Sequence, residues 1–429
     1  MPLIRDVRRL ALYRLVLPFG VALLALLPGT DAIALPQTLS LSDILARTID
    51  YDPTARAGAA HIRAAEASLD QADTRPNPVL GIEMEDFAGS GNYSRFDETS
   101  TTLYYEELWE RGGKRKARTD IAGAELALAE KRRTANLLDL AAEVQAAWID
   151  AIAAQAAAVL ADDRLAAVKQ MEREFQRRAN RALDPQFAHE RVLAMLSQAQ
   201  IDSEQAALSA QTTRATLASY WGGDGNFRLD EAEFTRLAMN GELDDDPTDL
   251  ALLTAARETA AARVRFEKAN SVQDVSLRAG LRHFSADDDV AVVFGVSIPL
   301  GVYDTNRSSI ERAQAEQLAA EIDIAAARNR RQREIARLIA AQSAGAVEIR
   351  RLDAEILPRL ERALALVREG FNRGGTAFTL LDVTESQRAL TDAYSRRIDL
   401  LRRFHLDGMR LDRLSDRHFS LLSNVEHKQ

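Results

Sequence analysis

The stretch VSLRAGLRHFSADDDVAVVFGVSI, residues 275–298, decides the fold predicted for this 429-residue chain. On both sides of its acidic centre, apolar residues alternate with small, polar or charged ones. A period of two is typical of a β-strand, whose successive side chains point to opposite faces. The two runs, at 275–284 and 290–299, are about ten residues long, the length that a tilted strand needs to cross a bilayer. The stretch predicts a hairpin of membrane-length strands; a soluble hairpin is the alternative.

A second strand pair is predicted at 79–87 and 99–109, where the sequence again alternates and is rich in Thr and Tyr. In both pairs one face is apolar while the other carries charged or small residues, as the wall of a water-filled barrel requires. We expect lipid to contact Leu80, Val292 and Phe294. The candidates for the barrel lumen are Glu83, Glu85, Arg278 and Arg282. The alternative for these four is simple charge pairing across strands.

Long helices are predicted to carry the strands. From Lys114 to about Asn180 the chain has no proline and apolar residues spaced three and four apart. From Ser308 to Leu357 a seven-residue repeat predicts coiled-coil packing. Its rows are Ile335, Gln342, Ile349 and Ile356, with Leu338, Gly345 and Leu352 beside them. After the N-terminal region no stretch approaches 18 consecutive apolar residues, so only strands are expected to span a membrane.

The N-terminal residues predict export from the cytoplasm. Four arginines precede an apolar run at 15–27, and Ala32-Ile33-Ala34 forms a small-x-small cleavage site. We therefore expect residues 1–34 to be a signal peptide. The alternative is a transmembrane anchor, but the run of about 13 residues is shorter than the roughly 18 to 20 that a span needs.

Composition excludes several classes of function. The chain has no cysteine, which excludes a disulfide scaffold, a thiolate metal site and a cysteine nucleophile. Its net charge of −9 argues against a nucleic-acid partner. The six histidines lack metal-ligand spacing, and the sequence has no P-loop, GxSxG or dinucleotide-binding turn. We expect no catalysis, no cofactor and no stored metal.

An internal repeat divides the chain. LWERGGKR at 108–115 aligns with LGVYDTNR at 300–307, and each follows a strand pair and precedes a long helix. The expected parts are a first repeat at 35–221, a connector at 222–248, a second repeat at 249–414 and a tail at 415–429. Two strand pairs per chain are too few to close a barrel, whereas three chains would supply twelve strands.

These residues resemble the TolC-like outer membrane efflux proteins, and among them the CzcC-like branch associated with heavy-metal cation efflux. The more specific pieces are Gly113-Lys114-Arg115 with Arg118, and Val296-Ser297-Ile298-Pro299-Leu300 followed by Asp304 and Asn306-Arg307. The resemblance covers nearly the whole mature chain. It implies a mainly α, α+β fold: a homotrimeric twelve-stranded barrel in outer membrane lipid, continuous with a coiled-coil tunnel in the periplasm. A periplasmic adaptor and an inner membrane resistance-nodulation-division pump would dock at the far end.

The segment from Phe371 to Leu390 resembles the second periplasmic hairpin turn of that family. The implied adaptor-docking candidates at the two turns are Asn180, Asp184, Pro185, Phe371, Gly374 and Gly375. Asp382 and Glu385 lie three residues apart and share a helix face. In a trimer they would form carboxylate rings that attract cations and gate the periplasmic end; a solvated helix face is the alternative.

The function implied is passive conduction of heavy-metal cations to the cell exterior. Two alternatives remain open at this point. The first is an outer membrane duct for drug efflux or type I protein secretion. The second is a periplasmic coiled-coil scaffold that forms no channel.

Overall fold

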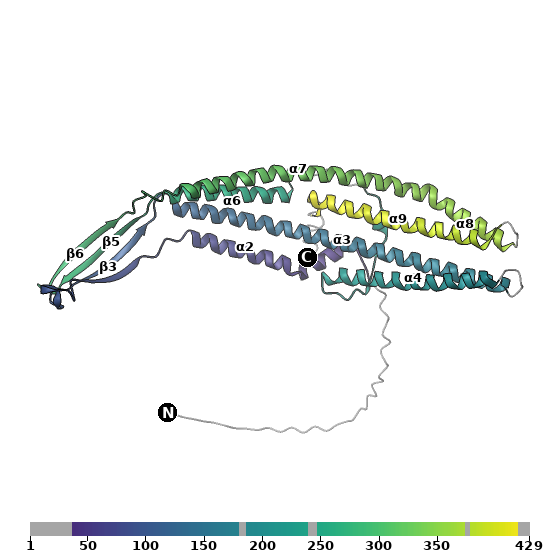
Figure 1. Ribbon diagram of the computed structural model, residues 1–429, viewed down its shortest axis with the longest axis horizontal. Coiled ribbons are helices and arrows are strands. Elements are labelled where there is room, and N and C mark those ends of the chain that lie inside the picture. Colours follow the sequence, from purple (N-terminus) through teal and green to yellow (C-terminus); the bar gives the residue numbers. More distant parts are fainter. Residues whose placement is uncertain (1–36, 180–185, 239–246, 374–377, 419–429) are drawn as a thin grey trace, which may run out of the picture.

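The computed structural model describes residues 37–179, 186–238, 247–373 and 378–418. The molecule is elongated, with strands at one end and two helical hairpins at the other (Figure 1). Several predictions lie outside the described residues: the signal peptide, the turn residues Asn180, Asp184, Pro185, Gly374 and Gly375, and the tail beyond residue 418.

Both halves of the chain contain a helix, two strands, a long helical stretch and a returning helix, and the first half has the additional helix α1. The first half contains α1 (Leu41–Tyr51), α2 (Pro53–Ala72), β2 (Val79–Glu85), a short 3-10 helix η1 (Gly91–Ser94), β3 (Ser100–Trp109), α3 (Lys114–Ala179) and α4 (Gln186–Ser219). The second contains α6 (Thr248–Asn270), β5 (Val275–Phe284), β6 (Asp289–Ser297), α7 (Arg307–Arg351), the π-helix η2 (Leu352–Ile356), α8 (Leu357–Asn372) and α9 (Leu380–Leu414).

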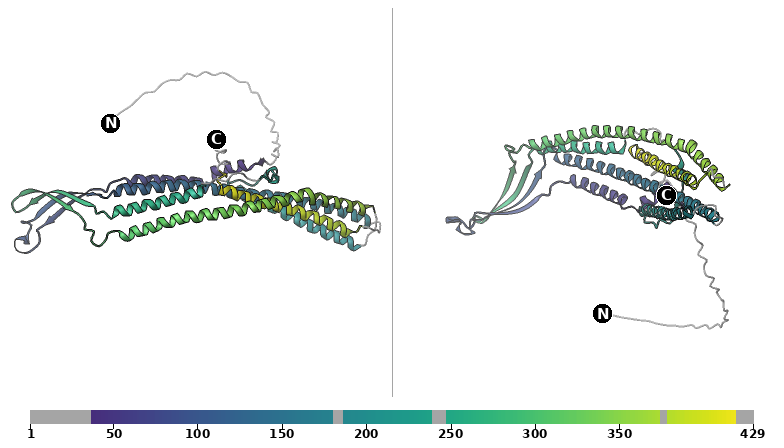
Figure 2. Two further views of the ribbon diagram at one scale, coloured as in Figure 1. Left: turned by 90° about the horizontal axis from the view of Figure 1, so that it is seen from above. Right: turned by 45° about the vertical axis from the view of Figure 1, so that its right-hand side comes forward.

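The helices form one long body. Near the strands α2 lies along α3 and α6 along α7, while α4, α8 and α9 extend toward the far end (Figures 1 and 2). α3 is 66 residues long because no proline interrupts it, and at 1.5 Å per residue it extends about 100 Å. Its residues Trp148, Ile149 and Ile152 form the main core with Leu217 of α4 and Leu401 of α9.

The strands form one sheet in the order β2-β3-β5-β6, with every neighbouring pair antiparallel. β2 ends two residues before the predicted strand because Asp86 and Ala88 have left-handed backbones, with φ of 63° and 57°. β6 likewise ends before Pro299, which has no N–H to give to a ladder. Within the described chain the outer edges of β2 and β6 are unpaired.

The connector contains structure that the sequence analysis did not predict. β1 (Gln37–Leu39) pairs in parallel with β4 (Phe227–Leu229), and α5 (Ala232–Thr235) follows. Phe227, Leu229 and Phe234 are buried in the main core, where they pack with residues of both halves. The described part of this segment therefore packs against the middle of the helical body.

The predicted heptad row is correct up to Ile349 and wrong at Ile356. Ile335, Gln342 and Ile349 are buried, but Ile356 is 43% exposed. The reason is the π-helix η2, which adds a residue to one turn and rotates the helix that follows. Leu352 at the start of η2 and Leu357 just after it are buried, and Pro358 lies in the first turn of α8, where a residue without an N–H is tolerated.

One helix departs from the expectation about membrane spans. A part of α3 within Lys114–Arg177 is long and apolar enough to cross a bilayer by length and composition. Counting only uninterrupted apolar runs missed it, because polar residues such as Gln155 interrupt the segment. The apolar residues Trp148, Ile149 and Ile152 have a structural explanation, since they pack in the core of the body.

Candidate functional site

The sheet has one apolar face. Leu80, Val292 and Phe294, predicted to contact lipid, are 73%, 81% and 70% exposed in the single chain. Leu103, Tyr105 and Leu281 alternate onto the same face through the strand register. We call this side the apolar face. Such a large exposed apolar surface requires a covering of lipid or protein.

The opposite side of the sheet is its charged face. The four predicted lumen residues all lie there, as directly opposed strand positions require. Arg278 Nη1 lies 3.3 Å from Glu83 Oε2, and Arg282 Nη2 lies 2.8 Å from Glu85 Oε2. The charges pair across strands, as the alternative reading proposed. Pairing leaves them partly exposed, so it does not exclude a lumen role.

Two further members of the charged face, Tyr104 and Glu106, were not predicted from the sequence. Glu106 accepts a 2.9 Å hydrogen bond from Arg278, and the Arg278 guanidinium carbon lies 4.0 Å from the centre of the Tyr104 ring. The signal was present, because Tyr104 and Glu106 are two residues apart and lie opposite Gly280 and Arg278. Only the register between β3 and β5 reveals that opposition.

The junction between strands and helices joins the two halves of the chain. Lys114 Nζ lies 2.7 Å from Asp274 Oδ2, and the Arg111 backbone N–H donates to Asp274 Oδ1. Partial burial works to raise the pKa of Asp274, but these hydrogen bonds outweigh it and lower that pKa below its usual range. Arg118 pairs with Glu110 and also donates to the Thr74 carbonyl. Lys114 and Arg118 thus connect the start of α3 to residues that flank the strands.

Glycine is required at this junction. Gly112 has φ of 68°, and a Cβ there would lie 2.7 Å from Val272 Cβ. Beyond the second strand pair, Asn306 adopts a similar left-handed backbone, and its side-chain amide donates to the Glu267 carbonyl. Both strand pairs therefore pass into their long helix through a left-handed turn tied to α6.

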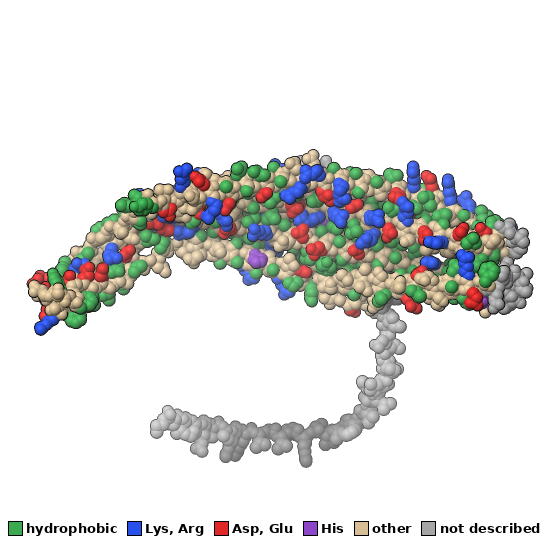
Figure 3. Space-filling view, viewed as in Figure 1, with side chains coloured by type: hydrophobic (Ala, Val, Ile, Leu, Met, Phe, Trp, Pro, Cys, Tyr) green, Lys and Arg blue, Asp and Glu red, His purple; other side chains and the backbone are tan. Residues whose placement is uncertain are grey.

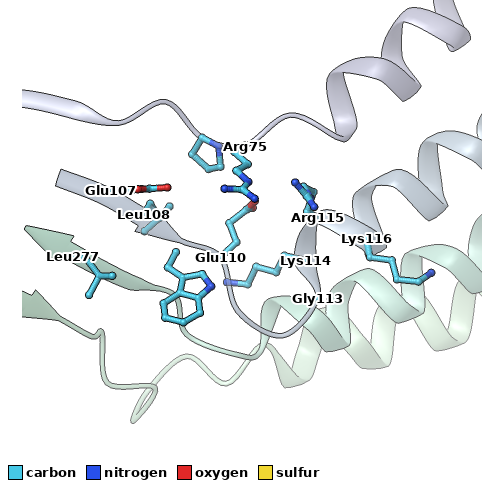
Figure 4. A pocket seen from close by; sticks show the side chains of 11 residues that line it. Arg75, Glu107, Leu108, Glu110, Gly113, Lys114, Arg115, Lys116 and Leu277 are labelled. Carbon is cyan, nitrogen blue, oxygen red and sulfur yellow. The ribbon is translucent and has the colours of Figure 1, made fainter. Parts of the chain in front are cut away.

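A pocket of about 500 Å³ lies beside the first junction. Arg75, Lys114 and Arg115 surround it together with Glu107 and Glu110, as Figure 4 shows. The pocket lining includes Glu107 and Leu277 of the apolar face and Leu108 of the opposite face. Its polar side chains mark the level at which the apolar face ends.

The hairpin end holds the remaining predicted residues that are described. Phe371 is buried and stacks on Phe175, with ring centres 5.2 Å apart. Its side chain therefore packs between the two hairpins, and the adaptor-docking role expected at this turn stays a prediction. Asp382 belongs to a capping box with Thr379, whose hydroxyl and backbone N–H both donate to the carboxylate at 2.7 Å.

Those hydrogen bonds lower the pKa of Asp382, so it is ionised at neutral pH. Glu385 is exposed one turn further along α9. The pair lies in the first turns of that helix, as the spacing predicts, but Asp382 also has a structural task at the helix N-terminus.

Among the described residues, no group of three or more His, Asp or Glu side chains is arranged to hold a metal ion. His405 is partly buried beside Phe234, and this burial lowers its pKa. His418 is buried with its Nε2 2.7 Å from Gln145 Oε1, and burial lowers its pKa to about 4. Both lie in the middle of the helical body, away from the sheet and the hairpin end.

No family model matches the chain, but individual proteins do. It is 24% identical over 435 residues to the cobalt-zinc-cadmium resistance protein CzcC of Cupriavidus metallidurans, covering 94% of this chain and 100% of CzcC. It is 25% identical over 306 residues to the nickel-cobalt-cadmium resistance protein NccC of Alcaligenes xylosoxydans, covering 70% of this chain and 69% of NccC.

Solved structures share the architecture. The crystal structure of CusC superposes with a TM-score of 0.74 at 16% identity, covering 89% of this chain and 93% of CusC. The outer membrane protein VceC of Vibrio cholerae superposes with a TM-score of 0.71 at 19% identity, covering 87% of this chain and 96% of VceC. The likeness shows the same fold of strand sheet and long helical hairpins.

Proposed function

Since this chain is a CzcC-like member of the TolC family of outer membrane efflux channels, we propose that it is the outer membrane component of a tripartite efflux system for heavy-metal cations. Three copies form the channel. The strands lie in the outer membrane, and the helical body extends into the periplasm. A periplasmic adaptor and an inner membrane resistance-nodulation-division pump complete the system.

The unclosed four-stranded sheet carries this proposal. Its apolar face is exposed, and the edges of β2 and β6 have no partner within the described chain. In a bilayer every backbone N–H and C=O needs a partner, so a spanning sheet has to close on itself. Three chains of four strands close a barrel of twelve, with the apolar face toward lipid and the charged face toward water.

The cargo passes through such a channel as a substrate and is not held by it. A conduit works when wall groups attract an ion enough for entry but too weakly for retention. The paired charges of Arg278 with Glu83 and of Arg282 with Glu85 suit that requirement. Support for metal cations comes from the names of CzcC and NccC, which are metal-resistance proteins.

At the periplasmic end we assign a gate to Asp382 and Glu385. The first turns of α9 follow the hairpin turn, so three copies would bring six carboxylates around the entrance. The adaptor would contact the exposed surface around the two turns. Buried Phe371 would support that surface from below through its stacking on Phe175.

The test is extraction of the mature protein from outer membranes with detergent, followed by mass determination and planar-bilayer recording. We expect a trimer that conducts. A water-soluble species without conductance would contradict the channel and favour a periplasmic scaffold.

The cargo is tested separately. A strain lacking the protein should become sensitive to divalent cations of the cobalt, zinc, cadmium or nickel type. Sensitivity to organic drugs alone, or loss of a secreted protein, would instead favour drug efflux or type I secretion.

A further inference from the structure

Arg278 reaches across the charged face from β5 to β2. Its Nη2 donates to Glu106 Oε2 on β3 at 2.9 Å, and its Nη1 donates to Glu83 Oε2 on β2 at 3.3 Å. Its guanidinium carbon lies 4.0 Å from the centre of the Tyr104 ring, which is within cation–π distance. Groups on two other strands therefore hold this one cation.

Glycines on both neighbouring strands flank Tyr104, whose ring lies beneath Arg278. Tyr104 lies directly between Gly81 of β2 and Gly280 of β5. A Cβ on Gly81 would lie 2.4 Å from Tyr104 Cζ, and one on Gly280 would lie 2.6 Å from the Leu103 carbonyl oxygen. A side chain at Gly81 would therefore collide with the Tyr104 ring, and one at Gly280 would collide with the backbone of β3. Arg278 rests over the ring on the charged face.

The charges of this cluster do not balance. Glu83, Glu85 and Glu106 provide three carboxylates against the two guanidinium groups of Arg278 and Arg282. One negative charge per chain remains. Loss of Arg278 alone would double that excess and would leave Glu83 and Glu106 without their guanidinium partner.

We propose that Arg278, positioned by Tyr104, is the residue that limits the cation selectivity of the barrel, and that Glu106 increases that selectivity. The inference rests on the proposed channel function. Fixed charges on a pore wall bias which ions pass, and their influence reaches about 10 Å at 0.1 M salt. A moderate excess of carboxylate favours cations, while the held guanidinium prevents the acids from retaining a divalent cargo.

The experiment compares single-charge variants as purified trimers in planar bilayers under a KCl gradient. In Arg278→Gln we expect the ratio of K⁺ to Cl⁻ permeability to rise about twofold or more at roughly 0.1 M salt, and the change to shrink near 1 M, where screening is stronger. In Glu106→Gln we expect the ratio to fall by a similar factor.

Glu107→Gln is the matched control. Glu107 is the next residue of β3, carries the same charge, and lies opposite Leu277 on the apolar face. We expect it to keep the wild-type ratio. If Arg278→Gln does not assemble, the comparison of Glu106→Gln with Glu107→Gln tests the proposal. A lower ratio in Glu106→Gln alone supports it, and equal ratios in the two variants overturn it.

The inference is overturned if Arg278→Gln and Glu106→Gln shift the ratio in the same direction, or if Glu107→Gln shifts it as much as Glu106→Gln does. Failure of the proposed function would give a different result, because the wild-type protein itself would then pass no current.

Discussion

The two ends of this molecule treat apolar surface in opposite ways. In the helical body, Leu138, Ile152 and Leu401 are almost fully buried within the single chain. In the sheet, Val292 and Phe294 are among the most exposed side chains. Figure 3 shows basic and acidic side chains interspersed over the helical body, which is the surface expected in water. The body supplies its own core, whereas the apolar face of the sheet is uncovered within the single chain, as the proposed barrel in lipid requires.

The two ends of the molecule also use charged side chains differently. In the body, ion pairs such as Arg413 with Asp139 and Asp249 join helices that are distant in sequence. In the sheet, the pairs of Arg278 and Arg282 lie on one face only. A substitution should therefore have effects that depend on which end, and which face, it changes.

The largest effect is expected from Val292→Arg. An arginine on the lipid side of a barrel costs about 2–4 kcal/mol near the bilayer midplane, so the yield of assembled outer membrane trimer should fall sharply. The control is Val293→Arg, because Val293 is the next residue but lies on the charged face opposite Gly280. Trimer yield on semi-native gels measures both. Equal yields would mean that the two faces do not differ in their surroundings.

Acid should weaken the helical body through His418. Burial lowers its pKa to about 4, whereas the unfolded side chain titrates near 6.5. Between these pH values the unfolded chain binds the proton more readily than the folded chain does. The contribution of neutral His418 to the free energy of unfolding is therefore fully present above pH 6.5 and is lost as the pH falls toward 4. The loss amounts to about 3 kcal/mol per chain.

The measurement for His418 is the thermal midpoint of the trimer between pH 7 and pH 4.5. His418→Gln should flatten this dependence, and substitution of the exposed His61 should not. An unchanged slope in His418→Gln would assign the acid sensitivity to other groups.

At the junction between the two ends, loss of one lysine side chain should destabilise the protein, whereas loss of another lysine nearby should not. The Lys114 side chain is 13% exposed and pairs with Asp274, whereas that of Lys116 is 81% exposed and pairs with Asp120. Lys114→Ala should lower the free energy of unfolding by about 2 kcal/mol, since the partly buried carboxylate of Asp274 loses its ammonium partner and keeps only the Arg111 N–H. Lys116→Ala should change it by less than about 0.5 kcal/mol. Denaturant titration measures both, and similar losses would contradict the proposed role of Lys114 at the junction.

The smallest effect on stability is expected at the hairpin end, where conductance is the readout. Asp382→Ala combined with Glu385→Ala should raise single-channel conductance if these carboxylates hold the entrance shut. Thr379→Ala is the control, because it removes the hydroxyl of the capping box and keeps both carboxylates. Unchanged conductance in the double variant would exclude the gate, and an equal rise in Thr379→Ala would attribute it to the cap.

Several residues that matter to function could be predicted because their signal is local. The alternation at 79–85 and 275–297 follows from the pleat, and it predicts that Glu83, Glu85, Arg278 and Arg282 share one face. The seven-residue repeat likewise predicted the buried row through Ile349. In both cases the period of the element fixes which side chains share a side.

Other features depend on contacts between distant segments. The pairing of β1 with β4 joins residues 37–39 to 227–229, and such short strands carry too little pattern to predict. Only the register of β3 against β5 places Arg278 over Tyr104 and beside Glu106. The spacing of Asp382 and Glu385 predicts a shared helix face, but only the start of α9 at Leu380 shows that Asp382 belongs to a capping box with Thr379.

By itself the sequence determined the length of the helices, the two faces of each strand and the twofold repeat of the chain, because each follows from the spacing of neighbouring residues. Only the tertiary structure decided which strands are neighbours, where the π-helix η2 turns Ile356 outward, and how Lys114 meets Asp274 across 160 residues. Those features depend on the relative placement of whole elements, which local spacing does not encode.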